Sequence, residues 1–281
     1  MSILSVRGLV KKYPAFTLGP VSFDLEPGRI TGFIGRNGAG KTTTLKSMLG
    51  FVHPDAGDVE FFGLGFKDHE AAIKSRIGFV SGGVDYYSQK KIKTIASVTA
   101  GFYANWDAGA YSGLMDRFRL DPEKTPAQLS EGMKVKFSLC LALSHKAELL
   151  VLDEPTSGLD PVSRDELLDV FLDLKASGVT ILFSTHITSD LDKCADRILY
   201  IRSGRLLADS TIEGFLDEYR LAVAGPQGFA PEQEKALAGL RRTRDGASGL
   251  FRKSDAEALG LACEKPSLES AMVHLEKEFQ S

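Results

Sequence analysis

The sequence predicts an α/β fold whose core is a mostly parallel β-sheet. A glycine-rich segment at 35–42 stands between a strand pattern at 29–34 and a helix pattern at 43–49. Two apolar runs without alternation, at 148–152 and 179–184, are typical of strands that are buried on both faces of a parallel sheet. The repeated order of strand, helix and strand implies parallel strands joined by right-handed crossovers.

The remaining patterns extend this core. Strand patterns at 3–10, 16–25, 58–63 and 77–80 precede the first buried apolar run. From about residue 84 to residue 146 the pattern becomes mostly helical, which predicts a helical subdomain inserted into the α/β core.

The composition changes near residue 211, and we expect a large domain at 1–211 followed by a small extension at 212–281. The extension ends in an amphipathic helix pattern. Its apolar face carries Leu268, Met272, Leu275 and Phe279. This face packs either onto the extension itself or against a dimer or regulatory partner, and the sequence alone leaves both alternatives open.

Composition limits the class of protein. The 281 residues include 43% hydrophobic and 25% charged side chains and carry a net charge of −3, which is ordinary for a soluble globular protein. Because there is no basic excess, no nucleic-acid partner is expected. No apolar run approaches the roughly 18–20 residues of a membrane span, and the segment 1–14 lacks the apolar core of a signal peptide. We therefore expect a cytoplasmic location. We also expect Cys140, Cys194 and Cys263 to be buried, reduced thiols, because their spacing does not suit a metal site.

The segment Gly35–Thr42 matches G-x-x-x-x-G-K-[ST], a phosphate-binding loop. Its glycines allow successive backbone N–H groups to point into one concavity that suits an anion, and the following helix N-terminus adds positive potential. Lys41 is expected to reach the β- and γ-phosphates, and Thr42 to place its hydroxyl on Mg²⁺. The nucleotide-binding residues expected from this motif are Gly35, Asn37, Gly38, Ala39, Gly40, Lys41, Thr42 and Thr43.

Two carboxylates follow the buried run at 148–152. Asp153 is expected to hold Mg²⁺ beside Thr42, directly or through water. Glu154 is expected to accept a proton from the attacking water or to orient it. The structural alternative is that both side chains cap the turn that follows.

His186 follows the second buried run. The order of strands in a parallel sheet brings it toward the γ-phosphate, where a neutral imidazole can hydrogen-bond a phosphate oxygen and sense its loss. The expected catalytic residues are thus Lys41, Glu154 and His186, although a lone histidine is more often structural.

The order of these motifs identifies a family. The phosphate loop at 35–42 is followed by Leu-Ser-Glu-Gly-Met at 129–133, by an apolar strand with Asp-Glu-Pro-Thr-Ser-Gly-Leu-Asp at 149–160, and by Ser-Thr-His at 184–186. From about residue 2 to residue 211 the chain resembles the ATP-binding subunit of an ABC transporter. The resemblance implies an ABC ATPase fold: a P-loop parallel-sheet core with an antiparallel β subdomain, an inserted helical subdomain and, here, a small C-terminal α+β extension.

The resemblance also implies a shared site. Ser130 and Gly132, at the start of the helix after 129–133, would contact the γ-phosphate of ATP bound to a second subunit. Two subunits would pack head to tail around two ATP molecules, with Asp160 at their interface. Tyr13 would stack on adenine, although a tyrosine at a strand end is commonly a packing residue. The second subunit is another copy or a related ATPase.

Two departures from the family pattern stand out. The family usually has Gly-Gly-Gln after the signature serine, whereas this chain has Glu131-Gly132-Met133. A glutamate there places negative charge near phosphates unless its side chain turns away or meets a cation. The family also has a glutamine after the strand at 77–80, where this chain has Gly82, and Gln89 is at the wrong spacing.

The resemblance narrows the function. The segment Phe102–Asp107 and the Pro-Ser-Leu-Glu sequence near the C-terminus resemble bacterial exporter ATPases. We expect an ATPase that uses ATP and Mg²⁺ and drives an integral membrane permease from the inner face of the membrane. The alternatives are a soluble ABC-type ATPase that acts on nucleic acid or ribosomes and a P-loop kinase. Such soluble ATPases usually carry basic linkers or tandem cassettes, which this chain lacks.

Overall fold

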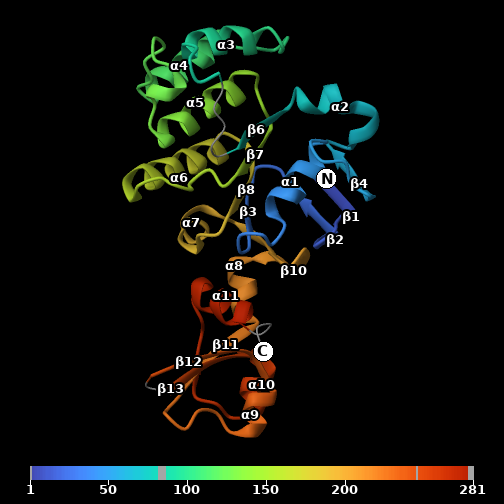
Figure 1. Cartoon of the computed structure of the whole chain (residues 1–281), viewed down its shortest axis with the longest axis vertical. Coiled ribbons are helices and arrows are strands. Elements are labelled where there is room, and N and C mark those ends of the chain that lie inside the picture. Colours follow the sequence, from blue (N-terminus) through green and yellow to red (C-terminus); the bar gives the residue numbers. More distant parts are fainter. Residues whose placement is uncertain (1, 82–86, 245, 278–281) are drawn as a thin grey trace. The chain divides into compact units, whose positions relative to one another are not determined.

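The computed structural model describes residues 2–81, 87–244 and 246–277. The chain divides into two compact units, and the division falls between Asp209 and Ser210 in the sequence (Figure 1). The first unit contains β1 (Leu4–Tyr13), β2 (Phe16–Leu25), β3 (Ile30–Ile34), α1 (Lys41–Met48), β4 (Ala56–Phe61), β5 (Leu64–Gly65), α2 (Phe66–Lys74), β6 (Ile77–Ser81), α3 (Ile92–Ala100), α4 (Ala108–Arg117), the 3₁₀ turn η1 (Pro126–Gln128), α5 (Glu131–Ser144), β7 (Leu149–Asp153), α6 (Pro161–Ala176), β8 (Thr180–Thr185), α7 (Thr188–Cys194), β9 (Arg197–Arg202) and β10 (Arg205–Thr211), which crosses the boundary.

The core of the first unit is a six-stranded sheet in the order β10-β9-β3-β8-β7-β6. Strand β3 pairs in parallel with β8 and β9, and β7 pairs in parallel with β6 and β8. Every residue of β3, β7 and β8 is buried, so the predicted parallel sheet is confirmed. The register sets Ile34 beside Thr185 and Asp153 beside Ser184. The carboxyl ends of three strands therefore meet at one edge of the sheet.

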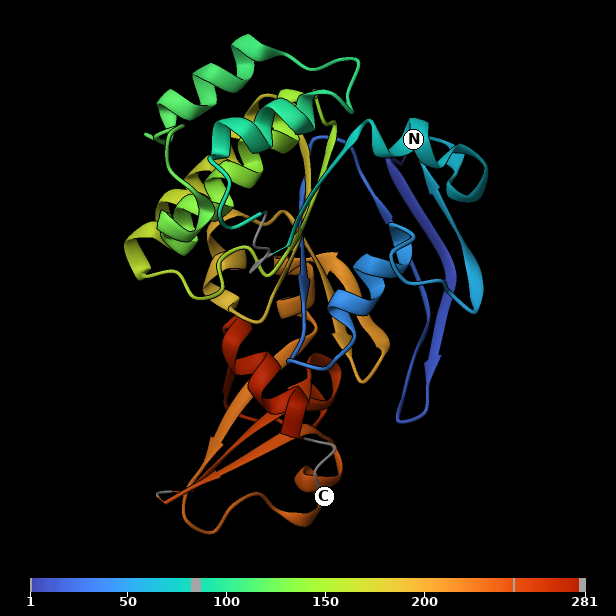
Figure 2. The ribbon, with the colours of Figure 1, turned by 45° about the horizontal axis from the view of Figure 1, so that its top comes forward.

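A second, antiparallel sheet has the order β2-β1-β4-β5. Figure 2 shows α1 between this sheet and the parallel one. Leu45 and Met48 of α1 belong to one buried cluster with residues of both sheets, and the rings of Phe23 and Phe33 lie 6.3 Å apart across it. This shared core fixes α1, and with it the loop that precedes α1.

Helices α3, α4 and α5 lie at the end of the first unit that contains β6 (Figure 1). The segment 102–107 packs on the end of α5: Tyr103 stacks on His145 with ring centroids 3.9 Å apart, and the Asn105 side chain donates to the His145 carbonyl. Burial lowers the pKa of His145. Asp107 caps α4 by accepting the N–H of Ala110. This segment therefore joins two helices.

The second unit contains α8 (Ile212–Asp217), β11 (Tyr219–Ala224), α9 (Pro231–Lys235), β12 (Leu237–Thr243), β13 (Gly246–Arg252), α10 (Lys253–Ala258), β14 (Cys263–Glu264) and α11 (Leu268–Lys277). Its antiparallel sheet has the order β12-β13-β11-β14. Leu268, Met272 and Leu275 of α11 are buried, and the helix packs on β12 and β13. The apolar face of α11 thus covers the sheet of its own unit, while Phe279 falls outside the described residues.

The cysteines follow the expectation in two of three cases. Cys140 and Cys194 are buried, and burial raises the pKa of each thiol to about 12. The prediction was wrong for Cys263, which is exposed because it lies on β14, a two-residue strand at the sheet edge. Within the described part of the chain, no helix is both long and apolar enough to cross a bilayer.

Replacing Gly239 with alanine tests the packing of α11 on β12. A Cβ at Gly239 would lie 2.3 Å from the carbonyl oxygen of His274, so the backbones would have to move apart. We expect Gly239→Ala to lower the free energy of unfolding of the second unit by about 1–3 kcal/mol, the usual cost of overpacking. Chemical denaturation combined with hydrogen exchange of the β12 amides measures this effect.

The matched control is Gly225→Ala in the same unit, where a Cβ would meet no atom within 4 Å. Its effect should stay within about 0.5 kcal/mol, as for most surface substitutions. Equal effects of the two substitutions would contradict the close approach of α11 and β12.

Candidate nucleotide site

The phosphate loop joins the end of β3 to the start of α1 and depends on glycine at three positions. Gly38 and Gly40 have φ values of 82° and 113°, in the left-handed region that favours glycine. A Cβ at Gly35 would lie 2.3 Å from the carbonyl oxygen of Ile201 on β9. Ala39 donates its N–H to the Arg36 carbonyl at 3.0 Å, which closes the turn. The conformation of the loop before α1 is therefore fixed by its own glycines and turn hydrogen bond.

Lys41 folds back over this loop. Its ammonium donates to the carbonyl oxygens of Gly35 at 2.7 Å and Arg36 at 3.3 Å, and it lies 3.0 Å from Oε1 of Glu154. Only 6% of the residue is exposed. A buried cation is thus held at the loop by two carbonyls and one carboxylate.

Asp153 ends β7 and is buried at the centre of the site. Its Oδ1 accepts the hydroxyl of Thr42 from α1 at 3.0 Å and the hydroxyl of Ser184 from β8 at 2.7 Å. The same serine oxygen accepts the N–H of Glu154 at 2.9 Å. One carboxylate oxygen therefore joins the start of a helix to the ends of two strands.

Glu154 bridges two other predicted residues. Its Oε1 lies 3.0 Å from Lys41, and its Oε2 accepts Nδ1–H of His186 at 2.8 Å. Its φ of 51° is rare for a residue other than glycine and costs about 1–3 kcal/mol. The Ser157 N–H donates to the Glu154 carbonyl and holds the turn. Strain at this position aims the carboxylate between a cation and an imidazole.

The loop borders an open pocket of about 480 Å³. Its lining residues are Tyr13, Phe16, Arg36, Asn37, Gly38, Gly40, Lys41, Thr42, Thr43 and Glu154. Tyr13 ends β1 and is 41% exposed, with the Lys11 ammonium 5.8 Å from its ring centroid. Sequence reasoning had missed Phe16 and Arg36 as pocket residues. The only signal for Phe16 was that it is a second aromatic close to Tyr13.

Ser130 and Gly132 start α5. Ser130 caps the helix by accepting the N–H of Met133 at 3.3 Å. Glu131 forms an ion pair with Lys134 at 2.8 Å, so this departure from the family pattern meets a cation one turn further on. As far as the described residues go, Ser130 and Gly132 do not line the pocket of Glu154.

Asp160 caps α6. Its carboxylate accepts the N–H groups of Val162 and Ser163 at 3.0 Å and the Ser163 hydroxyl at 2.6 Å. These hydrogen bonds, led by the one from the Ser163 side chain, lower the pKa of the exposed Asp160 carboxyl. A Cβ on Gly132 would lie 3.5 Å from that of Ser163, so the starts of α5 and α6 are neighbours.

Two further observations bound the assignment. Gly82, where the family has its glutamine, lies outside the described residues. Over the ranges that the structure describes, no three His, Cys, Asp or Glu side chains are grouped so as to hold a metal ion by themselves. Thr42 and Asp153 thus offer two oxygen donors, a partial ligand set that water and phosphate oxygens can complete.

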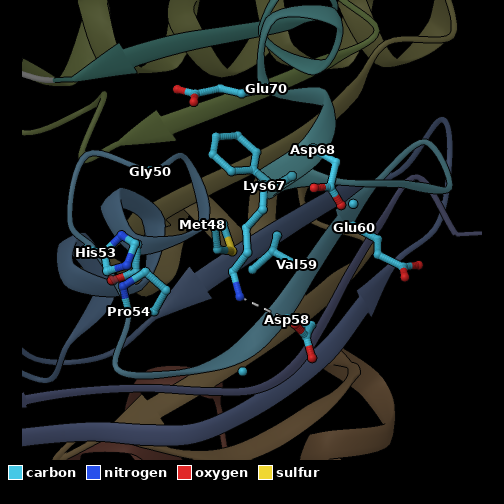
Figure 3. A pocket seen from close by; sticks show the side chains of 14 residues that line it. Met48, Gly50, His53, Pro54, Asp58, Val59, Glu60, Lys67, Asp68 and Glu70 are labelled. Atoms are coloured by element: carbon cyan, nitrogen blue, oxygen red, sulfur yellow. Dashed lines mark ion pairs between the residues drawn. The ribbon is translucent and has the colours of Figure 1, made fainter.

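A second pocket of about 450 Å³ lies between the end of α1, β4 and α2 (Figure 3). Its rim carries charges of both signs: Lys67 extends toward Asp58, with 3.9 Å between nitrogen and oxygen, and Asp68 and Glu70 stand nearby. None of the predicted site residues lines it. The loop pocket is therefore the candidate nucleotide site.

Comparison with known proteins agrees with this site. Residues 18–157 match the family model described as ABC transporter. The chain is 32% identical over 212 residues to the bacitracin transport ATP-binding protein BcrA of Bacillus licheniformis, covering 74% of this chain and 69% of that protein. It is 31% identical over 220 residues to the Nod factor export ATP-binding protein I of Burkholderia orbicola (strain AU 1054), covering 76% and 72%.

A solved ATP-binding subunit of an ABC transporter has the same fold, with a TM-score of 0.69 and 29% identity over 76% of this chain and 91% of that one. The predicted α/β fold class and the family resemblance are thereby confirmed. The chain belongs to the family of ABC transporter ATP-binding subunits, which are ATPases that power transport.

Proposed function

We propose that this chain binds ATP with Mg²⁺ at the loop pocket, hydrolyses it in a head-to-tail dimer and drives a separate membrane permease, in the direction of export. The proposal depends on one observation. Glu154 contacts both Lys41 and His186, and Thr42 donates a hydrogen bond to the neighbouring Asp153. A cation, a carboxylate and an imidazole stand next to oxygen donors at the mouth of a preformed phosphate loop, which is the arrangement that phosphoryl transfer to water requires.

Lys41 changes partners when ATP binds. In this structure its ammonium forms an ion pair with Glu154 at 3.0 Å. Phosphate oxygens at the loop offer the ammonium a stronger set of charge-assisted hydrogen bonds. Transfer of the lysine to the phosphates leaves Glu154 free to take a proton from water, so the base becomes available only when the substrate is present.

Thr42 and Asp153 suit Mg²⁺. A hydroxyl and a carboxylate are the hard oxygen donors that this ion prefers, and their oxygens already converge to 3.0 Å. A Mg²⁺ ion held by these two residues would neutralise part of the negative charge of the phosphates. The hydroxyl of Ser184 donates to the same Oδ1 and helps to fix the Asp153 carboxylate.

His186 senses the γ-phosphate. Its Nδ1–H now points at Glu154, which fixes the ring. To donate Nδ1–H to a phosphate oxygen, the ring must turn away from Glu154. That rotation breaks its contact with Glu154, so occupation of the γ-phosphate position and release of the base are coupled.

The dimer completes the site. Ser130 and the N–H groups in the first turn of α5 form an anion-binding end. They lie outside the pocket of Glu154, as expected for groups that serve the ATP of a second subunit. Asp160, in the turn beside Gly132, belongs to the same interface. The second subunit is a copy of this chain or a related ATPase.

The permease places the chain at the cytoplasmic face of the membrane. The relatives named for bacitracin transport and Nod factor export support a transporter that moves its substrate outward. The segment Phe102–Asp107, whose sequence resembles that of exporter ATPases, joins α4 to the end of α5. A net charge of −3 gives no support to the nucleic-acid or ribosome alternative.

Lys41→Ala should weaken nucleotide binding. Loss of hydrogen bonds to charged groups costs about 1.5–3 kcal/mol, or roughly tenfold to 150-fold in Kd. Isothermal titration with ATP and Mg²⁺ measures this change. Lys46→Ala, on the same helix, is the control and should bind normally. An unchanged affinity for ATP in Lys41→Ala would contradict the assignment of this loop to the nucleotide site.

Glu154→Gln should bind ATP and stop hydrolysing it, because an amide cannot accept the proton of water. General base catalysis contributes about 10²–10⁴ in rate, and ATP-bound dimer should accumulate in size-exclusion chromatography. Glu148→Gln, at the opposite end of β7 where Glu148 pairs with Arg76, serves as the control. Rapid turnover by Glu154→Gln would refute its role as base.

The permease is tested by capture from membranes. Tagged Glu154→Gln, with ATP and Mg²⁺, should recover a polytopic membrane protein in stoichiometric amount from gently solubilised native membranes. Lys41→Ala is the control that should recover less of it. Recovery of ribosomes or nucleic acid without a membrane protein would overturn the transporter assignment.

A further inference from the structure

Asp190, in the first turn of α7, is a buried carboxylate with none of its surface exposed. Its Oδ2 accepts the hydroxyl of Thr156 at 2.7 Å and that of Thr185 at 3.3 Å. Its Oδ1 has no hydrogen-bond partner among the described residues and lies 3.6 Å from Nη1 of Arg164. The two oxygens thus hold different parts of the chain.

The partners of Asp190 belong to three segments of the proposed site. Thr156 stands two residues after Glu154, in the turn that leads to Asp160. Thr185 directly precedes His186, and its hydroxyl also accepts the N–H of Ile187 at 3.0 Å, which fixes the start of the loop. Arg164 lies in the first turn of α6, the helix that Asp160 caps.

The contact between Asp190 and Arg164 does not fully satisfy either charged group. A buried charge is costly unless its partners satisfy it in full. Here the ion pair is long, and both Oδ1 of Asp190 and Nε of Arg164 lack a hydrogen bond within the described chain. A short, bidentate pair would satisfy both groups. The distance of 3.6 Å is longer than in such a pair, so Arg164 has room to approach Asp190.

We propose that Asp190 is a positioning residue for ATP hydrolysis, which holds Glu154 and His186 in one geometry through Thr156 and Thr185 and ties that geometry to the second subunit through Arg164. The inference rests on the proposed function, because it assumes that the turn at Asp160 meets the partner. When the second subunit binds that turn, the start of α6 moves, and the distance between Arg164 and the Asp190 carboxylate changes. The positions of base and imidazole then depend on whether the dimer has formed.

Asp190→Ala removes this link without touching ATP. A misplacement of about 1 Å in a catalytic group lowers rates about a hundredfold, so kcat should fall by that order. The Kd for ATP should stay within about threefold, since no nucleotide contact is lost. Asp192→Ala is the matched control: this exposed carboxylate is two residues further along the same helix, and its loss should leave kcat unchanged.

Thr156 offers an independent test that survives a folding defect in Asp190→Ala. Thr156→Val keeps the shape of this buried side chain and removes the hydroxyl, and it should lower kcat about tenfold or more with little change in ATP affinity. Thr156→Ser restores the hydroxyl and should restore kcat. Equal kcat in the valine and serine variants would overturn the proposal.

A double-mutant cycle with His186→Ala separates positioning from general stability. Because Asp190 acts through His186 and Glu154, its loss should cost much less in the His186→Ala background than in the wild type. Additive losses, or an Asp190→Ala kcat equal to that of wild type, would overturn the inference. A wild type without ATPase activity would instead overturn the proposed function, so the two failures are distinguishable.

Discussion

The structure depends on the hydrogen bonds that meet at Asp153. Its buried Oδ1 accepts Thr42 from α1 and Ser184 from β8, and so it locks the helix after the phosphate loop to the ends of two parallel strands. Glu154 and His186 take their positions from this junction, since one follows Asp153 in the chain and the other comes two residues after Ser184. Burial of such a carboxylate is tolerated because donors satisfy it.

Much of this could be predicted from residue order. Carboxyl ends of parallel strands share one edge, so polar residues that follow apolar runs, such as Glu154 and His186, converge there. The ion pair of Glu131 with Lys134 also follows from i,i+3 spacing on a helix. The α/β class followed from the unalternated apolar runs, which the structure buries on both faces.

Other features depend on tertiary contacts that no local pattern reports. Asp190 resembles any acidic residue in a first helical turn, and only the fold brings Thr156 and Arg164 to it. Phe16 joins the nucleotide pocket because β2 turns back beside Tyr13. Cys263 is exposed, contrary to the prediction that it is buried. It lies on an edge strand of two residues, which is too short to show an alternating hydrophobic pattern in the sequence. Hydrophobic periodicity reports which face is buried and not which polar groups meet.

The contacts of Glu154 bear on how its activity is controlled. Its carboxylate lies between the Lys41 ammonium and the His186 imidazole, so the proposed base is occupied on both oxygens. In the proposed mechanism ATP draws both partners away from Glu154, and the second subunit sets the positions of Glu154 and His186 through the turn at Asp160. Two inputs, nucleotide and partner, are then required before water is activated.

The rate of ATP hydrolysis per subunit, measured over a range of chain concentrations together with light scattering, tests this account most directly. The account predicts a rate per subunit that rises with concentration as dimers form and then levels off. A constant, full rate at concentrations where light scattering shows only monomers would contradict it, because one subunit would then contain everything that hydrolysis needs.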